Sequence, residues 1–387
     1  MSEVSAQTSR MLRAIGPFTE WNRSLPEDRP CDFLFGNPHE VAPRTYVDAL
    51  LAATEPSGVD HYAYKMNEAD ATEAVSAGLR RRFDLAFEPE DVLMTNGNFA
   101  GLTIVLRTIV DPTDEVVFIS PPWFFYETLI LASGATPVRV LAGPPAFDLD
   151  LEALSRAITP RTRAIIVNSP NNPSGRIYPR PTLEALGALL AEASERHGRT
   201  VYLISDEAYN RILFDGRSFP TPVAHYPHSF MLYTYAKTLL SPGSRLGYIA
   251  LPPSMPEREE LRVPLLVGQI ATGWTFPVAP LQYAVPALER LGPDLDALQR
   301  RRDRVVSALQ EQGYEVVRPE ATFYVLVRSP LEDDRRFAEV LAGRGVFVLP
   351  GSMFEMPGWL RISLTANDEM VERAIPHFAA ALGEAAA

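Results

Sequence analysis

The stretch Ala164–Tyr209, AIIVNSPNNPSGRIYPRPTLEALGALLAEASERHGRTVYLISDEAY, contains a complete strand–helix–strand pattern. Ala164–Asn168 and Thr200–Ser205 are short and mostly apolar, which suits strands that are buried on both faces. Pro179–His197 lies between them and has helical spacing of its apolar residues. Parallel strands need a crossover connection of this length, so the stretch predicts an α/β domain with a mostly parallel sheet.

The same alternation continues on both sides of this unit. Further strands are expected at Asp91–Thr95, Val116–Ser120, Thr136–Val140, Phe230–Tyr235 and Leu246–Leu251. Helical patterns at Asn98–Val110 and Asp150–Ile158 lie among them. A doubly covered sheet of this kind forms a large domain, which we expect to span residues 46–290.

From about Pro293 the pattern changes to that of a smaller α+β domain, expected at residues 291–387. The first 45 residues are expected to join it. Its predicted elements are a helix at Asp294–Gln312, strands at Tyr314–Arg318 and Thr322–Val327, a helix at Asp333–Gly343, strands at Val346–Val348 and Trp359–Leu364, and a last helix from Asn367.

Composition narrows the function classes. A chain of 387 residues is long enough for two domains, and its formal net charge of −12 argues against partners such as nucleic acid or anionic lipid. Cys31 is the only cysteine, which fits a reducing compartment such as the cytoplasm. Val263–Leu288 carries no charge but contains four prolines, so it predicts a buried or interfacial segment and not a membrane helix. His61, His225 and His228 show no metal-ligand spacing, and no metal site is expected.

Polar or aromatic residues follow five of the predicted strands. They are Asn96-Gly97-Asn98, Pro121-Pro122-Trp123, the loop Ser169–Gly175, Asp206–Tyr209 and Ala236-Lys237-Thr238. Ligands of open α/β sheets bind beyond the carboxyl ends of the strands, so these groups are expected to converge on one crevice.

The chemistry of this set describes one ligand. The helix that begins after Gly97 offers backbone N–H groups to a phosphate, and Arg245 can neutralise the same dianion. Trp123 offers a flat face to a planar ring, and Asp206 can hold a ring nitrogen in its protonated form. Lys237 offers an amine that forms an imine with an aldehyde. A phosphate, a pyridinium and an aldehyde together describe pyridoxal 5'-phosphate.

At this point the sequence resembles the class I/II aminotransferases, which are pyridoxal-phosphate enzymes of fold type I. The resemblance runs from about Asp32 to the last helix. It rests on motifs in the family's order: Asn168–Gly175, Ser205–Tyr209, Thr234–Thr238 with Ser244–Tyr248, and Pro350-Gly351 followed by Gly358–Ser363. It implies a large domain with a seven-stranded sheet, a small domain built from both chain ends, and a homodimer with shared active sites.

The resemblance also implies a role for each matching residue. Lys237 would carry the cofactor as a Schiff base and move the substrate proton, and Asp206 would pair with the pyridine nitrogen. Tyr209 and Asn172 would donate to the ring hydroxyl oxygen, and Trp123 would stack on the ring. The phosphate would be held by Thr234, Arg245, the backbone at Gly97, Asn98 and Phe99, and Tyr62 of a neighbouring subunit. The substrate α-carboxylate would meet Arg361, Gly36 and Asn172.

The sequence departs from the family pattern at the phosphate turn, where Asn98 and Phe99 replace small or charged residues. Simpler interpretations also exist for single residues. Asp206 alone would suit a helix N-cap, Asn172 a turn, Trp123 an ordinary core position, and Arg361 a structural ion pair. The combination of motifs favours the cofactor site.

The expected activity is transamination between an α-amino acid and a 2-oxo acid by a ping-pong mechanism. The alternatives are a lyase, cyclase or oxidase of the same fold type, and a non-catalytic sensor module of a transcription regulator. The aromatic residues Phe18, Trp21, Phe99 and Trp123–Tyr126 predict a neutral, hydrophobic or aromatic side chain as the distinctive substrate. No second cation obviously faces this wall, although Arg23, Arg44 or Lys65 could enter from either subunit.

Overall fold

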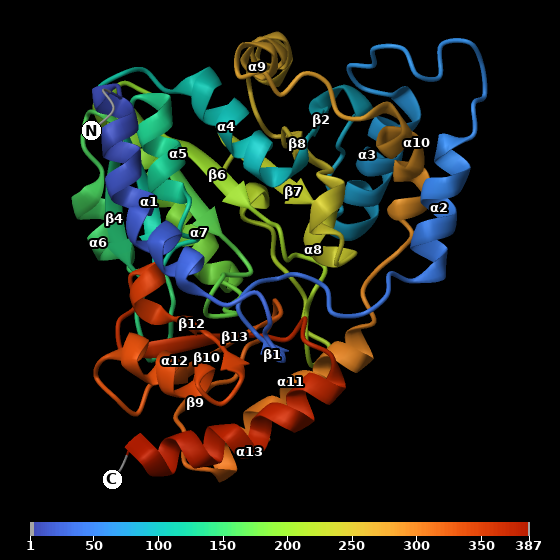
Figure 1. Ribbon diagram of the computed structural model, residues 1–387. Coiled ribbons are helices and arrows are strands. Elements are labelled where there is room, and N and C mark those ends of the chain that lie inside the picture. The colour runs from blue at the N-terminus through green and yellow to red at the C-terminus, as the bar shows by residue number, and fades with distance from the viewer. Residues whose placement is uncertain (1–3, 386–387) are drawn as a thin grey trace.

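The computed structural model describes residues 4–385, and its centre is a seven-stranded sheet (Figure 1). The strand order is β2-β8-β7-β6-β5-β3-β4. The strands β7, β6, β5, β3 and β4 run parallel to one another, while β8 runs antiparallel to both β2 and β7. The predicted mostly parallel sheet is therefore confirmed. The strands are β2 (Val92–Thr95), β3 (Glu115–Ser120), β4 (Thr136–Leu141), β5 (Thr162–Asn168), β6 (Tyr202–Asp206), β7 (Ser229–Thr234) and β8 (Gly247–Ala250).

Helices cover both faces of this sheet, which explains why its strands are apolar almost throughout. In β3, Val116 and Phe118 pack in the cluster that includes α4 and α5, while Val117 and Ile119 pack in the cluster that includes α6 and α7. The helices around the sheet are α2 (Arg44–Thr54), α3 (Ala69–Phe83), α4 (Gly97–Ile109), α5 (Tyr126–Ser133), α6 (Leu151–Ala157), α7 (Arg180–His197), α8 (Tyr235–Thr238), α9 (Arg258–Ala271) and α10 (Ala279–Leu288).

A four-stranded antiparallel sheet in the order β12-β13-β10-β9 forms the C-terminal part. Strand β9 is shorter than the expected Tyr314–Arg318, because only Val316 and Val317 pair with β10. The elements are α11 (Leu295–Glu311), β9 (Val316–Val317), β10 (Tyr324–Arg328), α12 (Asp334–Ala342), β11 (Val346–Phe347), β12 (Leu349–Pro350), β13 (Trp359–Ser363) and α13 (Asp368–Ala385).

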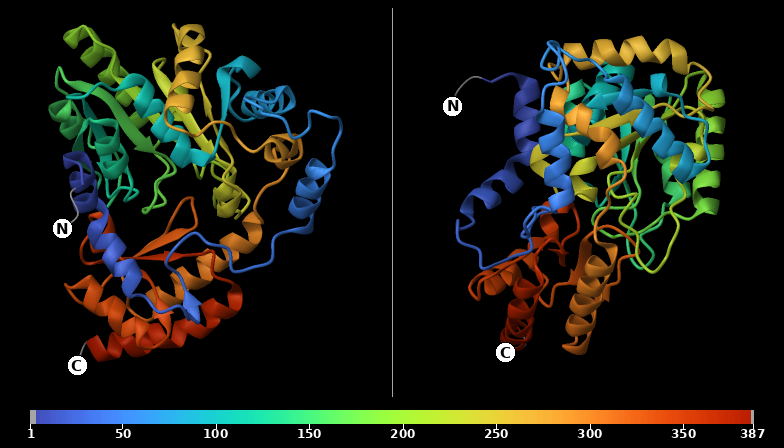
Figure 2. Two further views of the ribbon diagram at one scale, coloured as in Figure 1. Left: turned by 45° about the horizontal axis from the view of Figure 1, so that its top comes forward. Right: turned by 90° about the vertical axis from the view of Figure 1, so that its right-hand side faces the viewer.

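The N-terminal segment contacts both parts of the chain (Figure 2). Helix α1 (Ala6–Ser24) lies against α5, where the side-chain amide of Gln7 donates to the carbonyls of Leu131 and Ala132. Strand β1 (Cys31–Asp32) then pairs in parallel with β11. The segment therefore bridges the side of the large sheet and the C-terminal part.

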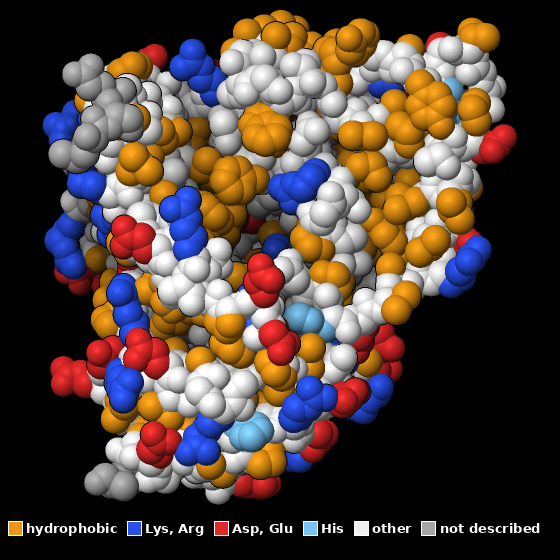
Figure 3. Space-filling model, in the orientation of Figure 1, with side chains coloured by type: hydrophobic (Ala, Val, Ile, Leu, Met, Phe, Trp, Pro, Cys, Tyr) orange, Lys and Arg blue, Asp and Glu red, His pale blue; other side chains and the backbone are white. Residues whose placement is uncertain are grey.

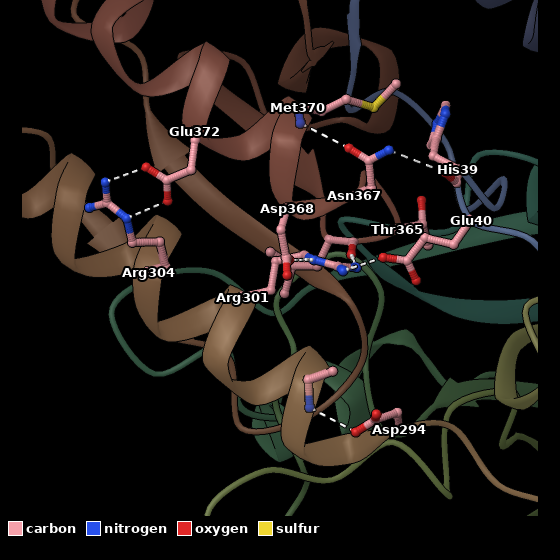
Figure 4. Close-up of polar contacts among 12 residues, drawn as sticks. His39, Glu40, Asp294, Arg301, Arg304, Thr365, Asn367, Asp368, Met370 and Glu372 are labelled. Atoms are coloured by element: carbon pink, nitrogen blue, oxygen red, sulfur yellow. Dashed lines mark hydrogen bonds and ion pairs between the residues drawn. The ribbon is translucent and has the colours of Figure 1, made fainter.

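The buried side chain of Arg301 ties the segment after β1 to the C-terminal helices (Figure 4). Its guanidinium group donates to Glu40 at 2.5 Å, to Asp368 at 2.7 Å and to the Leu364 carbonyl at 3.0 Å. The side-chain amide of Asn367 adds a bond to the His39 carbonyl. These bonds fix the chain between β1 and α2 on the C-terminal part.

The uncharged Val263–Leu288 segment forms most of α9, a connecting loop and α10. Helix α10 packs against α2 and α3, but α9 leaves Val263, Val267 and Ile270 between 52% and 67% exposed. Hydrophobic side chains are visible on the surface over α9 (Figure 3).

Over residues 4–385, no helix is both long and apolar enough to cross a membrane. The described side chains also include no group of three or more potential ligands that could hold a metal ion.

Candidate active site

A cavity of about 130 Å³ opens where the carboxyl ends of β5, β6 and β7 meet the start of α4. Nine of the predicted site residues line it, at the carboxyl ends of the strands where open α/β sheets bind their ligands. These nine are Asn98, Phe99, Trp123, Asn172, Asp206, Tyr209, Thr234, Lys237 and Arg245, and the other lining residues are Asn168, Ala208, Ala236 and Pro242. The structure thus brings together side chains that are up to 147 positions apart, from Asn98 to Arg245.

The start of α4 and the side chain of Arg245 form one edge of the cavity. Gly97 adopts φ +81°, and a Cβ atom there would lie 2.8 Å from the Arg245 guanidinium. Only glycine satisfies both conditions without strain. Arg245 donates to the Pro242 carbonyl at 3.0 Å, and burial lowers the pKa of its guanidinium. The helix N-terminus and this cation together make an anion-binding edge.

Asp206 ends β6 and lies at the floor of the cavity, only 5% exposed. Its Oδ2 accepts a hydrogen bond from the Tyr126 hydroxyl, and its Oδ1 accepts one from the Asn98 side-chain amide, both at 2.6 Å. Burial raises the pKa of Asp206, whereas Tyr126, the Ala208 N–H, Asn98 and the nearby charge of Lys237 act in the opposite direction. The sequence predicts Tyr126 only as part of the aromatic wall. Its position three residues after Trp123, at the start of α5, is the signal that links it to the same strand end.

The Asn-rich loop after β5 is held in place by hydrogen bonds of its own side chains. The Asn168 carbonyl oxygen Oδ1 accepts from the Asn172 backbone N–H at 2.7 Å, and Asn168 Nδ2 donates to the Asp206 carbonyl at 2.9 Å. Arg361 then donates to Asn172 Oδ1 at 3.1 Å. The turn chemistry and the site geometry therefore depend on the same residues, and Asn168 is a lining residue that the sequence analysis did not single out.

Arg361 lies on β13 and is buried beside the ring of Tyr324, with its Cζ atom 4.0 Å from the ring centroid. Its Nη2 donates to the Leu34 carbonyl at 2.8 Å, while its buried Nε has no partner among the described atoms. Burial lowers the pKa of Arg361, and despite its own burial the pKa of Tyr324 is also lowered, by Arg361 and Lys237. A Cβ at Gly36 would lie 2.8 Å from Phe323 and 3.2 Å from the Tyr324 hydroxyl, so only glycine fits there.

Lys237 lies in α8, the single helical turn that follows β7. The Thr234 hydroxyl caps this turn by accepting from the Ala236 N–H at 3.2 Å and donates to the Leu246 carbonyl at 3.1 Å. The Nζ of Lys237 lies 5.9 Å from the centroid of the Phe323 ring. The amine therefore lies between the large sheet and the C-terminal part of the chain.

Comparison with known families agrees with this arrangement. Residues 35–378 match the family described as aminotransferase class I and II.

The chain belongs to this family.

Similar proteins include other members of the class. The aminotransferase is 34% identical to the aspartate/prephenate aminotransferase of Thermus thermophilus over 90% of each chain. It is 32% identical to the arginine–pyruvate transaminase of Pseudomonas aeruginosa, over 87% of this chain and 85% of that protein. The crystal structure of an amino transferase from Eubacterium rectale is also similar, with a TM-score of 0.87 and 29% sequence identity. The match covers 99% of this chain and 96% of that protein. The predicted fold, family and transaminase activity are thereby confirmed, and the lyase, cyclase or oxidase alternative is not favoured.

Tyr62 of the aminotransferase does not reach the cavity of its own chain. Its side chain is 61% exposed, and its hydroxyl donates to the Thr54 carbonyl. Tyr64 is 97% exposed and Val59 is fully exposed in the same loop between α2 and α3. The predicted role of Tyr62 at the phosphate of a neighbouring subunit stays a prediction.

Proposed function

We propose that this aminotransferase binds pyridoxal 5'-phosphate in the cavity between β5, β6, β7 and α4. The proposal rests on three features that lie around one cavity. They are the anion-binding edge at Gly97 and Arg245, the buried carboxylate of Asp206 and the amine of Lys237. The phosphate would be held by the N–H groups of Asn98 and Phe99, by Arg245 and by the Thr234 hydroxyl, which would exchange its bond to the Leu246 carbonyl for one to the phosphate. Tyr62 of a second copy would complete that group.

The remaining lining residues suit the rest of the cofactor. Trp123 offers an indole face for the ring, while Asn172 and Tyr209 offer donors for its hydroxyl oxygen. Asp206 would hold the proton on the pyridine nitrogen because an ionised carboxylate stabilises a buried cation. Lys237 would attach covalently through Nζ.

The chain's own residues would then carry the transfer of the amino group. Pyridoxal phosphate, when bound, supplies an aldehyde that accepts the amino group and a ring that withdraws electrons from Cα. The free Nζ of Lys237 would take the proton from the substrate Cα and deliver it to the aldehyde carbon that the cofactor supplies. Arg361 would hold the α-carboxylate by two parallel hydrogen bonds, with the backbone at Gly36 closing over it. Fixing the carboxylate orients the Cα proton toward Lys237.

For the substrate side chain we propose a neutral, hydrophobic or aromatic group. Phe18 of α1 stacks on Phe124 with ring centroids 4.3 Å apart, and Phe125 lies 4.7 Å from Phe124. Phe99 continues the cluster, with its centroid 5.2 Å from those of Phe125 and Trp123. A carboxylate against such a wall would lose hydration without gaining a partner, whereas each buried methylene contributes about 0.8 kcal/mol.

None of the three cations named for a distal carboxylate lines the cavity of this chain. Arg23 is exposed in the last turn of α1. Arg44 pairs with Asp48 on α2, and Lys65 pairs with Asp60 in the loop that carries Tyr62. None of the described residues that line the cavity is a cation other than Lys237 and Arg245. The relatives named above are named for aspartate or prephenate and for arginine, so family membership leaves the side chain open.

We also propose a homodimer in a reducing compartment, the cytoplasm. The exposed apolar side chains of α9 and of the loop with Val59 and Tyr64 provide a surface for a second copy. Exposed Tyr62 needs such a partner to reach a phosphate. Cys31 is a buried free thiol, which suits reducing conditions.

The test is a spectral and kinetic screen. The purified protein with pyridoxal phosphate should show a visible absorbance band that is lost when a suitable amino acid is added and regained with a 2-oxo acid. The kcat/KM values for leucine, methionine, phenylalanine and tyrosine should exceed that for aspartate, with glutamate included as a general donor. If aspartate leads by tenfold or more, the proposed substrate class is wrong. If no band forms, the cofactor proposal is wrong.

A further inference from the structure

The side chain of Asn98 connects the two ends of the proposed cofactor site. Asn98 is the second residue of α4, on the turn whose backbone would face the phosphate. Its Nδ2 donates to Asp206 Oδ1 at 2.6 Å, across 108 positions of sequence. Its own Oδ1 is buried and has no hydrogen-bond partner among the described atoms. The side chain therefore does more than fill space beside the turn.

The hydrogen bonds of Asp206 leave its carboxylate with one orientation. An ionised carboxylate offers about two acceptor positions on each oxygen. Oδ1 accepts from Asn98 and, at 3.3 Å, from the Ala208 N–H, so both of its positions are occupied. Oδ2 accepts from the Tyr126 hydroxyl and retains one free position. A protonated ring nitrogen would be bound there.

The length and polarity of asparagine suit this contact. Alanine or serine at position 98 would be too short to carry a donor across the same gap. Aspartate would have the same shape but would place a second acceptor 2.6 Å from the buried Asp206 oxygen, where like charges repel. Backbone N–H groups are present with any residue, so the phosphate contact does not explain why the side chain is an amide.

We propose that Asn98 is a positioning residue that orients Asp206 and keeps it ionised, so that the proton stays on the pyridine nitrogen of the cofactor. The proposal rests on the proposed function, because it requires pyridoxal phosphate in the cavity. It extends that function by giving the phosphate turn a second task at the opposite end of the ring. Asn98 would act through Asp206 and would not touch the reacting atoms.

The test compares two cofactors that differ only at the ring nitrogen. The apoenzyme is titrated with pyridoxal phosphate and with its analogue in which carbon replaces the pyridine nitrogen, and binding is followed by absorbance and by quenching of tryptophan fluorescence. Asn98→Ala should weaken pyridoxal phosphate by about tenfold, since bonds to charged groups are among the stronger ones. Its affinity for the carbon analogue should stay within about twofold, because that ring has no proton to hold.

Two further variants sharpen the comparison. Asn98→Asp should weaken pyridoxal phosphate more than Asn98→Ala does, and it should shift the pH dependence of the bound cofactor's absorbance. Asn96→Ala is the matched control, because Asn96 precedes the same helix and makes no side-chain hydrogen bond that caps it. In Asn96→Ala, the ratio of the affinity for pyridoxal phosphate to that for the carbon analogue should equal the ratio in the unmodified protein.

The outcomes separate this inference from the cofactor proposal. Equal weakening of both cofactors by Asn98→Ala would show that the side chain acts on the phosphate or on folding, and it would overturn the inference. If Asn98→Ala leaves the binding of both cofactors unchanged, the inference is also overturned. If the unmodified protein binds neither cofactor, the proposed function fails and the inference with it. Should Asn98→Ala not fold, Asn98→Ser and Asn98→Asp decide by the same affinity ratio.

Discussion

Replacing Arg361 with glutamine tests how the protein selects amino and 2-oxo acids. Arg361 is 3% exposed on β13 and has few ways to satisfy its charge without a ligand. Asn172 and the Leu34 carbonyl each accept one hydrogen bond, and the buried Nε has no partner among the described atoms. The stacked Tyr324 ring adds attraction but no acceptor at the guanidinium edge. A substrate carboxylate would therefore meet a charge that is short of partners.

The expected loss follows from this geometry. Truncating one partner of a buried, hydrogen-bonded charge pair costs about 2–5 kcal/mol, which corresponds to a fall of about 30-fold to 5000-fold in kcat/KM. The pair forms in both the ground state and the transition state, so most of the loss should appear in KM. Arg361→Lys should lose less than Arg361→Gln, because lysine keeps the charge without the two parallel bonds.

The assay is a single-turnover half-reaction with the best amino acid and with the amine that lacks only its carboxylate. Arg361→Gln should reduce kcat/KM for the amino acid and leave the amine within about threefold. Arg328→Gln is the matched control, since Arg328 is exposed on the neighbouring strand β10. Circular dichroism and cofactor uptake check folding. If Arg361→Gln retains the preference for the amino acid over the amine, the role assigned to Arg361 is refuted.

Three further changes probe the substrate wall, a buried carboxyl and the proposed dimer. Phe99→Lys places a cation in the aromatic wall, and the ratio of kcat/KM for aspartate to that for phenylalanine should rise about tenfold; an equal fall for both would contradict the proposed pocket. Burial raises the pKa of Glu207 from 4.5 to about 7, so the free energy of unfolding should fall as the pH rises from 4.5 to 7. Measured by urea unfolding, Glu207→Gln should remove on the order of 3 kcal/mol of this fall. An unchanged pH dependence in Glu207→Gln would show that Glu207 is not its source. Val267→Arg on α9 should lower the molar mass measured by light scattering toward that of the monomer. Leu141→Arg on the edge strand β4 is the control and should leave the molar mass unchanged. A dimer that Val267→Arg does not affect would place the interface elsewhere.

Most of the central sheet could be predicted from sequence because buried strands are short apolar runs that end in turn residues. Each of its seven strands lies within two residues of its expected bounds. The direction of β8 could not be predicted, since antiparallel pairing with β2 and β7 leaves the same apolar pattern. Helix α9 also could not be predicted from the sequence, because Pro264 lies inside it and its exposed apolar residues break the usual amphipathic pattern.

The site could be predicted to the extent that its residues follow strand ends. Lys237, Asp206 and Asn172 were found in this way and line one cavity. The contacts of Tyr126 and Asn98 with Asp206 could not be found, because they depend on side-chain direction across separate elements. The division of the chain at residues 45 and 290 stays a prediction.

Covalent attachment of pyridoxal phosphate at Lys237 is the central claim, and the sequence makes it simple to test. Lys65 and Lys237 are the only lysines in the chain, and Lys65 is an internal control because it pairs with Asp60 outside the cavity. The measurement is borohydride reduction of the protein with bound cofactor, followed by digestion and mass spectrometry. The account predicts the reduced cofactor on the peptide that contains Lys237, and its loss in Lys237→Ala together with nearly all turnover. Attachment at Lys65, or an active Lys237→Ala protein that keeps the visible band, would contradict it.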